Sequence, residues 1–238
     1  MRFLIIHAHH EPRSFNGAMT RQAVAALTVA GHEVVVSDLH TMDFDPVSDR
    51  RNFTAVKDPS RLKQQTEEEH ASANGGYAHE LQAEMDKLDW CDTLIFQFPI
   101  WWLGMPAILK GWIDRVFAVG RAYGGGRYFG KGVFNRKRAF CAVTVGGSAA
   151  TYSEIGIYGP IEPILFPIHH GILAFCGFTV IEPFVVYGPS RMSDVERAAT
   201  LKQYGDYVLN LDTAPTIPGP DITTYQGLVL KPAARQHS

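Results

Sequence analysis

Five short apolar stretches alternate with helical patterns, and this alternation constrains the fold more than any other feature. The first stretch, residues 2–8, is a continuous apolar run, which is typical of a strand buried on both faces of a parallel sheet. The other expected strands are 32–38, 92–98, 138–145 and 178–187. Helices are expected at 14–30, 79–90, 106–117, 161–176 and 194–210. This order predicts an α/β fold with a doubly wound five-stranded parallel sheet.

Two regions lack this regularity. Residues 39–76 are rich in charge, Asn and Pro without sustained periodicity, so we expect a long irregular excursion on the surface. Residues 212–238 are Pro-rich and predict an irregular C-terminal tail. The sequence therefore divides into one domain over 1–211 and a tail over 212–238.

Composition excludes several functional classes. The chain has 238 residues, of which 46% are hydrophobic and 19% charged, as in a globular protein with a sizeable core. Its 22 basic and 24 acidic residues nearly cancel, so neither nucleic acid nor an anionic membrane is an expected partner.

The cysteines and the apolar runs bear on where the protein works. Cys91, Cys141 and Cys176 form no metal or redox motif, which favours a reducing, cytoplasmic setting. No apolar stretch reaches the roughly 18 residues that span a bilayer, so no membrane insertion is expected.

The loops after the strands should carry the chemistry, because ligands of such sheets bind at the carboxyl ends of the strands. The first loop, residues 8–16, contains no glycine, which excludes a dinucleotide turn and a P-loop. It offers Ser14, Asn16 and a helix start to a phosphate, with His9 and Arg13 as further donors. Alternatively, Ser14 is only a helix cap.

The loop after the third strand, residues 97–106, holds two adjacent tryptophans, Trp101 and Trp102, between Pro99 and Gly104. A planar ring such as an isoalloxazine could stack on one indole while backbone groups meet its polar edge. A hydrophobic lid or a dimer contact is the alternative reading.

The loop after the fourth strand begins with Gly146 and Gly147. Paired glycines let backbone N–H groups approach a ligand closely, which suits negative charge developing on a reduced flavin. Tyr152 and Tyr158 follow and could donate hydrogen bonds to the same edge. A simple turn with ordinary tyrosines remains possible.

Together these loops resemble the NAD(P)H:quinone oxidoreductase family, the DT-diaphorase type of flavodoxin-like flavoprotein. The resemblance extends from about residue 3 to 211 and is most specific in the run from Gln97 to Trp112. Further matching segments are Ala8-His9, Ser14-Phe15-Asn16, Gly146-Gly147-Ser148, Gly171-Ile172-Leu173 and Phe175-Cys176-Gly177-Phe178. It implies a flavodoxin-like strand order 2-1-3-4-5, a flavin-binding domain over 1–211 and a homodimer with active sites at its interface. The tail would then pack on the domain or on the dimer partner.

Carried over by position, the resemblance assigns roles to particular residues. It implies FAD, rather than FMN, held by His9, Ser14, Phe15, Asn16, Pro99, Ile100, Trp101, Trp102, Leu103, Thr144, Val145, Gly146, Gly147, Tyr152 and Arg197. It implies a nicotinamide and quinone pocket lined by Trp102, Tyr123, Tyr128 and Phe175. The expected catalytic groups are Tyr152, Tyr158, Gly146 and Gly147.

The chain departs from the family pattern at four places. Tyr158 stands where a catalytic histidine is expected, and a phenol with a pKa of about 10 is a poorer proton shuttle than imidazole. Gly125 replaces an aromatic residue of the substrate pocket. One branch of the family binds zinc through a pair of histidines, and here Ala174 stands where the histidine that pairs with His170 is expected. The adjacent His169 and His170 cannot form such a pair, because neighbouring side chains diverge on a helix, so no metal is expected. The long C-terminal extension of some members is absent.

The activity that the resemblance implies is ping-pong hydride transfer from NAD(P)H through the flavin to a quinone, with azo or nitro compounds as further acceptors. Two alternatives stay open. One is a flavodoxin-type electron carrier, which the net charge of −2 and the aromatic pocket speak against. The other is an ancillary flavoprotein subunit of a membrane ion-efflux system.

Overall fold

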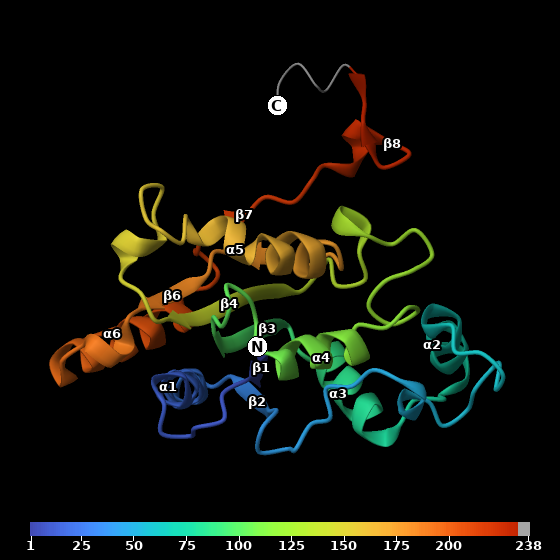
Figure 1. Ribbon diagram of the computed structural model, residues 1–238, viewed down its shortest axis with the longest axis horizontal. Helices are drawn as coiled ribbons and strands as arrows, with labels where there is room; N and C mark the ends of the chain where they lie inside the picture. Colours follow the sequence, from blue (N-terminus) through green and yellow to red (C-terminus); the bar gives the residue numbers. More distant parts are fainter. Residues whose placement is uncertain (233–238) are drawn as a thin grey trace.

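A twisted, mostly parallel sheet forms the centre of the computed structural model, which describes residues 1–232 (Figure 1). The strand order is β2-β1-β3-β4-β5-β7, and β6 pairs with β4 beyond the end of β5. All of these pairs are parallel except β5 with β7. The strands are β1 (Arg2–His7), β2 (Glu33–Asp38), β3 (Thr93–Pro99), β4 (Arg138–Val145), β5 (Thr179–Ile181), β6 (Phe184–Tyr187) and β7 (Thr216–Ile217). The predicted order 2-1-3-4-5 is confirmed.

Helices cover both faces of the sheet (Figure 1). The helices are α1 (Phe15–Val29), α2 (Gln64–Asn74), α3 (His79–Trp90), α4 (Ala107–Val116), α5 (Ile161–Ile168) and α6 (Asp194–Leu209). The inward residues of α1 and α6 share one apolar cluster with one face of the sheet, whereas those of α3, α4 and α5 share a cluster with the opposite face. This layering is that of a doubly wound α/β fold. None of the helices in residues 1–232 is long and apolar enough to cross a membrane.

The apolar runs form strands because they are buried on both sides. Every residue of β3 is buried, as are all residues of β4 except the first. Such continuous burial is what a parallel sheet covered by helices requires. β3 and β4 therefore lie in the middle of the sheet, and the loops that follow them start at its carboxyl edge.

Two predicted elements are divided in the structure. The strand expected at 178–187 is split into β5 and β6 at Glu182 and Pro183, because Pro183 has no N–H to donate to a sheet. The helix expected at 161–176 is α5 followed by a π-helical turn, η4 (His169–Ala174). Pro167 lies inside α5 and removes one helical N–H just before this change of hydrogen-bond register.

The region 39–76 is more regular than expected, because it contains α2 and the 3₁₀ turn η1 (Arg50–Asn52). Helix α2 ends at Gly75, whose φ of 67° is a left-handed conformation that glycine adopts without strain. Helix α2 has no apolar stripe, so the hydrophobic periodicity of the sequence did not predict it.

The tail also holds short regular pieces. Strand β7 joins the sheet edge, and β8 (Tyr225–Gln226) pairs with β9 (Val229–Leu230) in a small hairpin that stands away from the sheet (Figure 1). Part of the tail predicted at 212–238, residues 233–238, lies outside the described residues. How this tail relates to a second copy stays a prediction.

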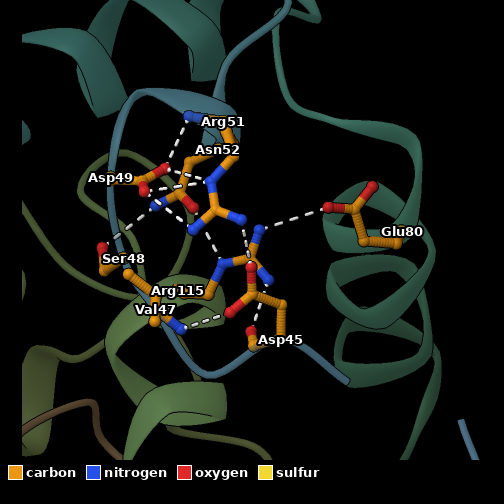
Figure 2. A network of polar contacts seen from close by, with 8 residues as sticks. All are labelled: Asp45, Val47, Ser48, Asp49, Arg51, Asn52, Glu80 and Arg115. Atoms are coloured by element: carbon orange, nitrogen blue, oxygen red, sulfur yellow. Dashed lines mark hydrogen bonds and ion pairs between the residues drawn. The ribbon is translucent and has the colours of Figure 1, made fainter. Parts of the chain in front are cut away.

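A strap over residues 44–53 crosses α3 and α4 and is held by one buried cation (Figure 2). Arg115, only 2% exposed, donates to Asn52 Oδ1 at 2.8 Å and to the Asp45 carbonyl at 2.6 Å, and it pairs with Glu80 at 3.2 Å. Gly111 permits the close approach, since a Cβ there would lie 2.2 Å from the Pro46 carbonyl oxygen. The excursion is therefore anchored rather than loose.

Candidate functional site

The carboxyl ends of β1, β3 and β4 are tied together by backbone hydrogen bonds. The Ala8 N–H donates to the Gln97 carbonyl at 3.0 Å, and the Ile100 N–H donates to the Thr144 carbonyl at 2.9 Å. The three loops expected to carry chemistry therefore start side by side, as the parallel order requires.

A buried polar network lies directly beneath these loops. Asn16 Nδ2 donates to Thr144 Oγ1 at 2.6 Å, and Gln97 Nε2 donates to Asn16 Oδ1 at 2.7 Å and to the Ala142 carbonyl at 3.1 Å. Gln97 Oε1 is buried without a partner in residues 1–232. Asn16 thus joins the first helix to the third and fourth strands and fixes the floor of the site. Sequence reasoning missed Gln97, because one amide in an apolar strand gives no periodic signal.

The start of α1 lies at this edge, and the free N–H groups of a helix N-terminus can bind an anion. Ser14 is the N-cap, and its Oγ accepts from the Gly17 N–H at 3.0 Å. A cavity of about 410 Å³ extends from Ser14 and Phe15 to Arg197 at the start of α6. The Arg197 guanidinium donates to the Pro189 carbonyl and pairs with Asp194, which holds it beside this cavity. Ser14, Phe15 and Arg197, three of the predicted cofactor residues, therefore lie together.

The loop after β3 turns its aromatic residues outward. Trp101 and Gly104 pair through two backbone hydrogen bonds of 3.0 Å, so Trp102 and Leu103 form the tip of a tight turn. Both tip residues have positive φ, 53° and 54°, which is strained for side chains of this size. Trp102 is fully exposed, whereas Pro99 and Ile100 are buried at the base of the turn.

Two imidazoles lie against this turn. The rings of His9 and His10 stack at 4.8 Å and lie 6.1 and 5.9 Å from the Trp101 ring. His9 Nδ1 accepts from the Glu11 N–H at 3.0 Å. Burial, followed by the neighbouring His10, lowers the pKa of His9. The lowered pKa favours the neutral imidazole, which can donate from one ring nitrogen and accept at the other.

The loop after β4 brings the two tyrosines into contact. The rings of Tyr152 and Tyr158 lie 5.0 Å apart; Tyr152 is buried and Tyr158 is half exposed. Burial is the main cause that raises the pKa of Tyr152, so its hydroxyl stays a hydrogen-bond donor at neutral pH. Tyr152 lies against Gly147, because a Cβ on this glycine would be 2.8 Å from the Tyr152 ring.

The site has a set of unused backbone donors that fits the polar edge of a flavin. In residues 1–232 the N–H groups of Trp102, Leu103, Gly146 and Gly147 have no hydrogen-bond partner. A Cβ at Gly146 would meet no protein atom within 4 Å, so the space above it is open. Three kinds of group can hold an isoalloxazine ring and its phosphates, namely free N–H groups, an outward indole and a helix N-terminus. All three are found here at neighbouring strand ends. Val145, the last residue of β4, has a buried side chain, so its contribution to the site would come from its backbone.

A second aromatic cluster lies apart from this site. Tyr123 and Tyr128 both contact Phe175, with ring centroids at 5.7 and 6.3 Å. In Figure 1 the yellow-green segment that carries the two tyrosines lies on the right, whereas the yellow loop with Tyr152 and Tyr158 lies on the left. Within one chain, no ring contact joins Tyr123, Tyr128 or Phe175 to Tyr152 or Tyr158 among the described residues.

Side chains of helix α2 form hydrogen bonds with the segment that carries Tyr123. The buried Glu68 accepts from the Val119 N–H at 2.8 Å, and Ser72 Oγ donates to the Val119 carbonyl at 2.8 Å. Gln65 Nε2 donates to the Tyr123 hydroxyl at 3.4 Å. Sequence reasoning missed this contribution because the region was expected to be irregular. The sequence carries no signal for it, because the burial of Glu67 and Glu68 is visible only in the structure.

The metal prediction concerns the end of α5. Over residues 1–232, no group of three or more His, Cys, Asp or Glu side chains has the arrangement of a metal site. Phe166 and His170 stack at 4.7 Å on this segment, and Ala174 ends the π-helical turn.

Comparison with known proteins agrees with this fold, which is that of a flavodoxin-like protein. A family model described as "Flavodoxin-like fold" matches residues 1–210. The chain is 42% identical over 236 residues to NAD(P)H dehydrogenase [quinone] 1 from Cavia porcellus, covering 97% of this chain and 86% of that protein. It is 44% identical over 211 residues to ribosyldihydronicotinamide dehydrogenase-like protein traD from Penicillium crustosum, covering 85% and 79%.

A solved structure extends the similarity to three dimensions. A protein from Klebsiella pneumoniae, described as a candidate quinone reductase, superposes with a TM-score of 0.91 at 41% identity and covers 98% of this chain and 93% of its own. The chain belongs to the flavodoxin-like family, and the relatives named here carry the names of quinone-reducing oxidoreductases.

Proposed function

We propose that the protein is a flavin-dependent oxidoreductase that uses NAD(P)H to reduce quinones. The observation that carries this proposal is the set of free N–H groups on Trp102, Leu103, Gly146 and Gly147 around an open space at the strand ends. A flavin bound at these groups would supply the two-electron hydride chemistry between NAD(P)H and the acceptor.

The chain's own residues hold and orient the partners. Ser14 and the α1 N-terminus bind phosphate, with His9 as a further donor. Gly146 and Gly147 present backbone donors to negative charge at the ring edge, and the Tyr152 hydroxyl adds a side-chain donor. The Tyr158 ring contacts the Tyr152 ring and is half exposed, which supports the proposal that its hydroxyl takes part in proton exchange with solvent at this edge.

The proposed flavin is FAD rather than FMN. The supporting observation is the cavity of about 410 Å³ that continues from Ser14 and Phe15 to Arg197, beyond the phosphate position. FMN ends at its phosphate and leaves this cavity unused, whereas the adenosine half of FAD would fill it.

The proposed active unit is a homodimer. Several exposed apolar side chains support this: Trp102, Leu103, Ile155, Ile157 and Phe166. Exposed apolar side chains that gather in a patch mark interaction sites. The substrate pocket would combine Trp102 and Tyr152 of one copy with the cluster of Tyr123, Tyr128 and Phe175 from the other.

An absorption spectrum of the purified protein tests the proposal. We expect a flavin spectrum, release of FAD on heating, and NAD(P)H oxidation that depends on added benzoquinone and needs no membrane fraction. A colourless protein that takes up neither FAD nor FMN overturns the proposal. Flavin binding without turnover favours a carrier or an ancillary subunit instead.

A further inference from the structure

Three imidazoles lie together at the carboxyl ends of β1 and β2. His9 and His10 follow β1, and their rings stack at 4.8 Å. His40 follows β2, and its ring meets the edge of the His10 ring at 5.9 Å. The Leu39 N–H donates to the His7 carbonyl at 3.0 Å, which holds the two strand ends side by side. We call His9, His10 and His40 the imidazole cluster.

Two hydrogen bonds join the imidazole cluster to the start of α1. His9 Nδ1 accepts from the Glu11 N–H at 3.0 Å, and the Glu11 carbonyl accepts from the Ser14 N–H at 3.0 Å. Ser14 is the N-cap of α1, and the free N–H groups of a helix start can bind phosphate. The cluster therefore borders the position proposed for the flavin phosphates.

Most ring nitrogens of the cluster are unused. Because His9 Nδ1 accepts a hydrogen bond, the neutral His9 ring carries its proton on Nε2. In residues 1–232 this Nε2 and the ring nitrogens of His10 and His40 have no hydrogen-bond partner. The cluster does not have the arrangement of a metal site within this range. Its free nitrogens can instead donate to an anion.

The charged groups around the cluster leave it without a counter-ion. Glu11 pairs with Arg13 at 3.4 Å, and Arg21 donates to a carbonyl of the same loop. Asp38, at the end of β2, accepts from a backbone N–H in the turn that follows. The turn after β3 has no charged residue between 100 and 106. Among the described residues, no carboxylate forms an ion pair with a ring of the cluster.

Positive charge on these rings is unfavourable until an anion arrives. Burial, and then the charges of His10 and His40, lower the pKa of His9. An anion among the rings offsets this repulsion and strengthens proton binding. The Trp101 ring lies 6.1 and 5.9 Å from the rings of His9 and His10, and an indole at this distance attracts a cation. Anion binding and proton binding by the cluster should therefore favour each other.

We propose that the imidazole cluster binds the diphosphate of the flavin and takes up a proton as it does so. The inference rests on the proposed flavin site and adds His10 and His40 to it. Imidazole is the side chain that ordinarily changes charge between pH 5 and 8. Because the diphosphate favours charged rings, flavin affinity should be highest near pH 6 and fall as the pH rises toward 8. His7 lies beneath the cluster, but burial lowers its pKa to about 4, outside this range.

FAD and riboflavin are the probes, because they share the ring system and only FAD carries phosphates. The diphosphate of FAD is esterified at both ends and keeps a constant charge from about pH 6 to 8, so protons taken up in this range bind to the protein. Isothermal titration of the flavin-free protein in two buffers of different ionisation enthalpy measures this uptake. Near pH 7 we expect about half a proton per FAD and none per riboflavin. FAD should bind about tenfold more tightly at pH 6 than at pH 8.

A double variant locates the proton uptake. His10→Gln with His40→Gln removes two exposed rings and leaves the hydrogen bond of His9 in place. At pH 6 this variant should bind FAD about tenfold more weakly than the wild type, whereas at pH 8 the two affinities should be equal. The control is His32→Gln with His70→Gln, which removes two histidines without a ring contact to the cluster. This control should keep the wild-type pH dependence.

The outcomes separate this inference from the proposed function. FAD binding without proton uptake, or a wild-type pH dependence in the His10 and His40 double variant, overturns the role of the cluster and leaves the flavin site intact. The same pH dependence for riboflavin as for FAD also overturns it, since riboflavin has no phosphates. A protein that binds neither FAD nor riboflavin contradicts the proposed function itself.

Discussion

At the scale of single residues, Gly146 and Gly147 are adjacent but have different structural reasons to be glycine. A Cβ at Gly147 would lie 2.3 Å from Thr151 Oγ1, whereas a Cβ at Gly146 would meet no protein atom within 4 Å. Neither glycine has a positive φ, so the two positions differ only in the space available to a Cβ atom. The packing of this loop therefore requires glycine at position 147 but not at position 146.

This contrast makes a matched pair of variants. Gly147→Ala should destabilise the flavin-free protein by about 1–3 kcal/mol through overpacking. Gly146→Ala should leave its stability within about 0.5 kcal/mol but weaken flavin binding about tenfold, because the added methyl occupies ligand space. Urea unfolding of the flavin-free protein and flavin titration measure the two effects. Wild-type flavin affinity in Gly146→Ala would show that the ring lies elsewhere.

Residue chemistry also decides how much of the site the sequence could reveal. Ser14, Trp102 and the glycine pair are recognisable because they follow predicted strands, where parallel sheets bind ligands. Asn16 is recognisable in the same way, but its buried hydrogen bond to Gln97 is not, since that bond joins residues 81 positions apart. Sequence identifies the loops of such a site but not the network beneath them.

At the scale of elements, the strap over residues 44–53 depends on one buried guanidinium, Arg115 (Figure 2). Arg115→Met should lower the free energy of unfolding by about 3–5 kcal/mol, since it leaves the Asn52 amide oxygen and the Asp45 carbonyl without their buried donor. Arg51 belongs to the same network, but its ion pairs with Asp45 and Asp49 are exposed. Arg51→Gln should therefore barely move the urea midpoint. Equal losses in the two variants would show that burial does not set the cost.

Elements that sequence periodicity missed share a physical cause. Helix α2 has Gln, Glu and Ala where an apolar stripe would be, and it is held by buried carboxylates such as Glu68 instead of an apolar face. Strand β7 has two residues and depends on pairing with β5. Both are stabilised by tertiary contacts, which local patterns do not contain. The long apolar strands were predictable because burial alone determines them.

At the scale of the whole molecule, two buried histidines predict acid lability. Burial lowers the pKa of both His7 and His169 to about 4, against 6.5 when unfolded. Between these values the unfolded chain binds more protons, so the free energy of unfolding should fall as the pH drops from about 7 to about 4. The fall is up to about 3 kcal/mol for each histidine. Urea unfolding across this range measures the fall in the free energy of unfolding. In His169→Leu this fall should be smaller by the contribution of one histidine. A flat profile would contradict neutral burial.

The separation of the two aromatic regions within one chain gives the test of a shared active site. Gly146→Ala impairs the proposed flavin end, and Phe175→Ala impairs the distant cluster with Tyr123 and Tyr128. If each pocket combines the flavin end of one copy with the cluster of the other, a hybrid of the two variants contains one pocket with both changes and one with neither. Quinone reduction should then recover in isolated hybrid dimers to about half the wild-type rate per dimer, although each parent dimer is impaired. If each chain carried a complete pocket, every pocket of the hybrid would keep one defect, and its activity would stay between those of the two parents.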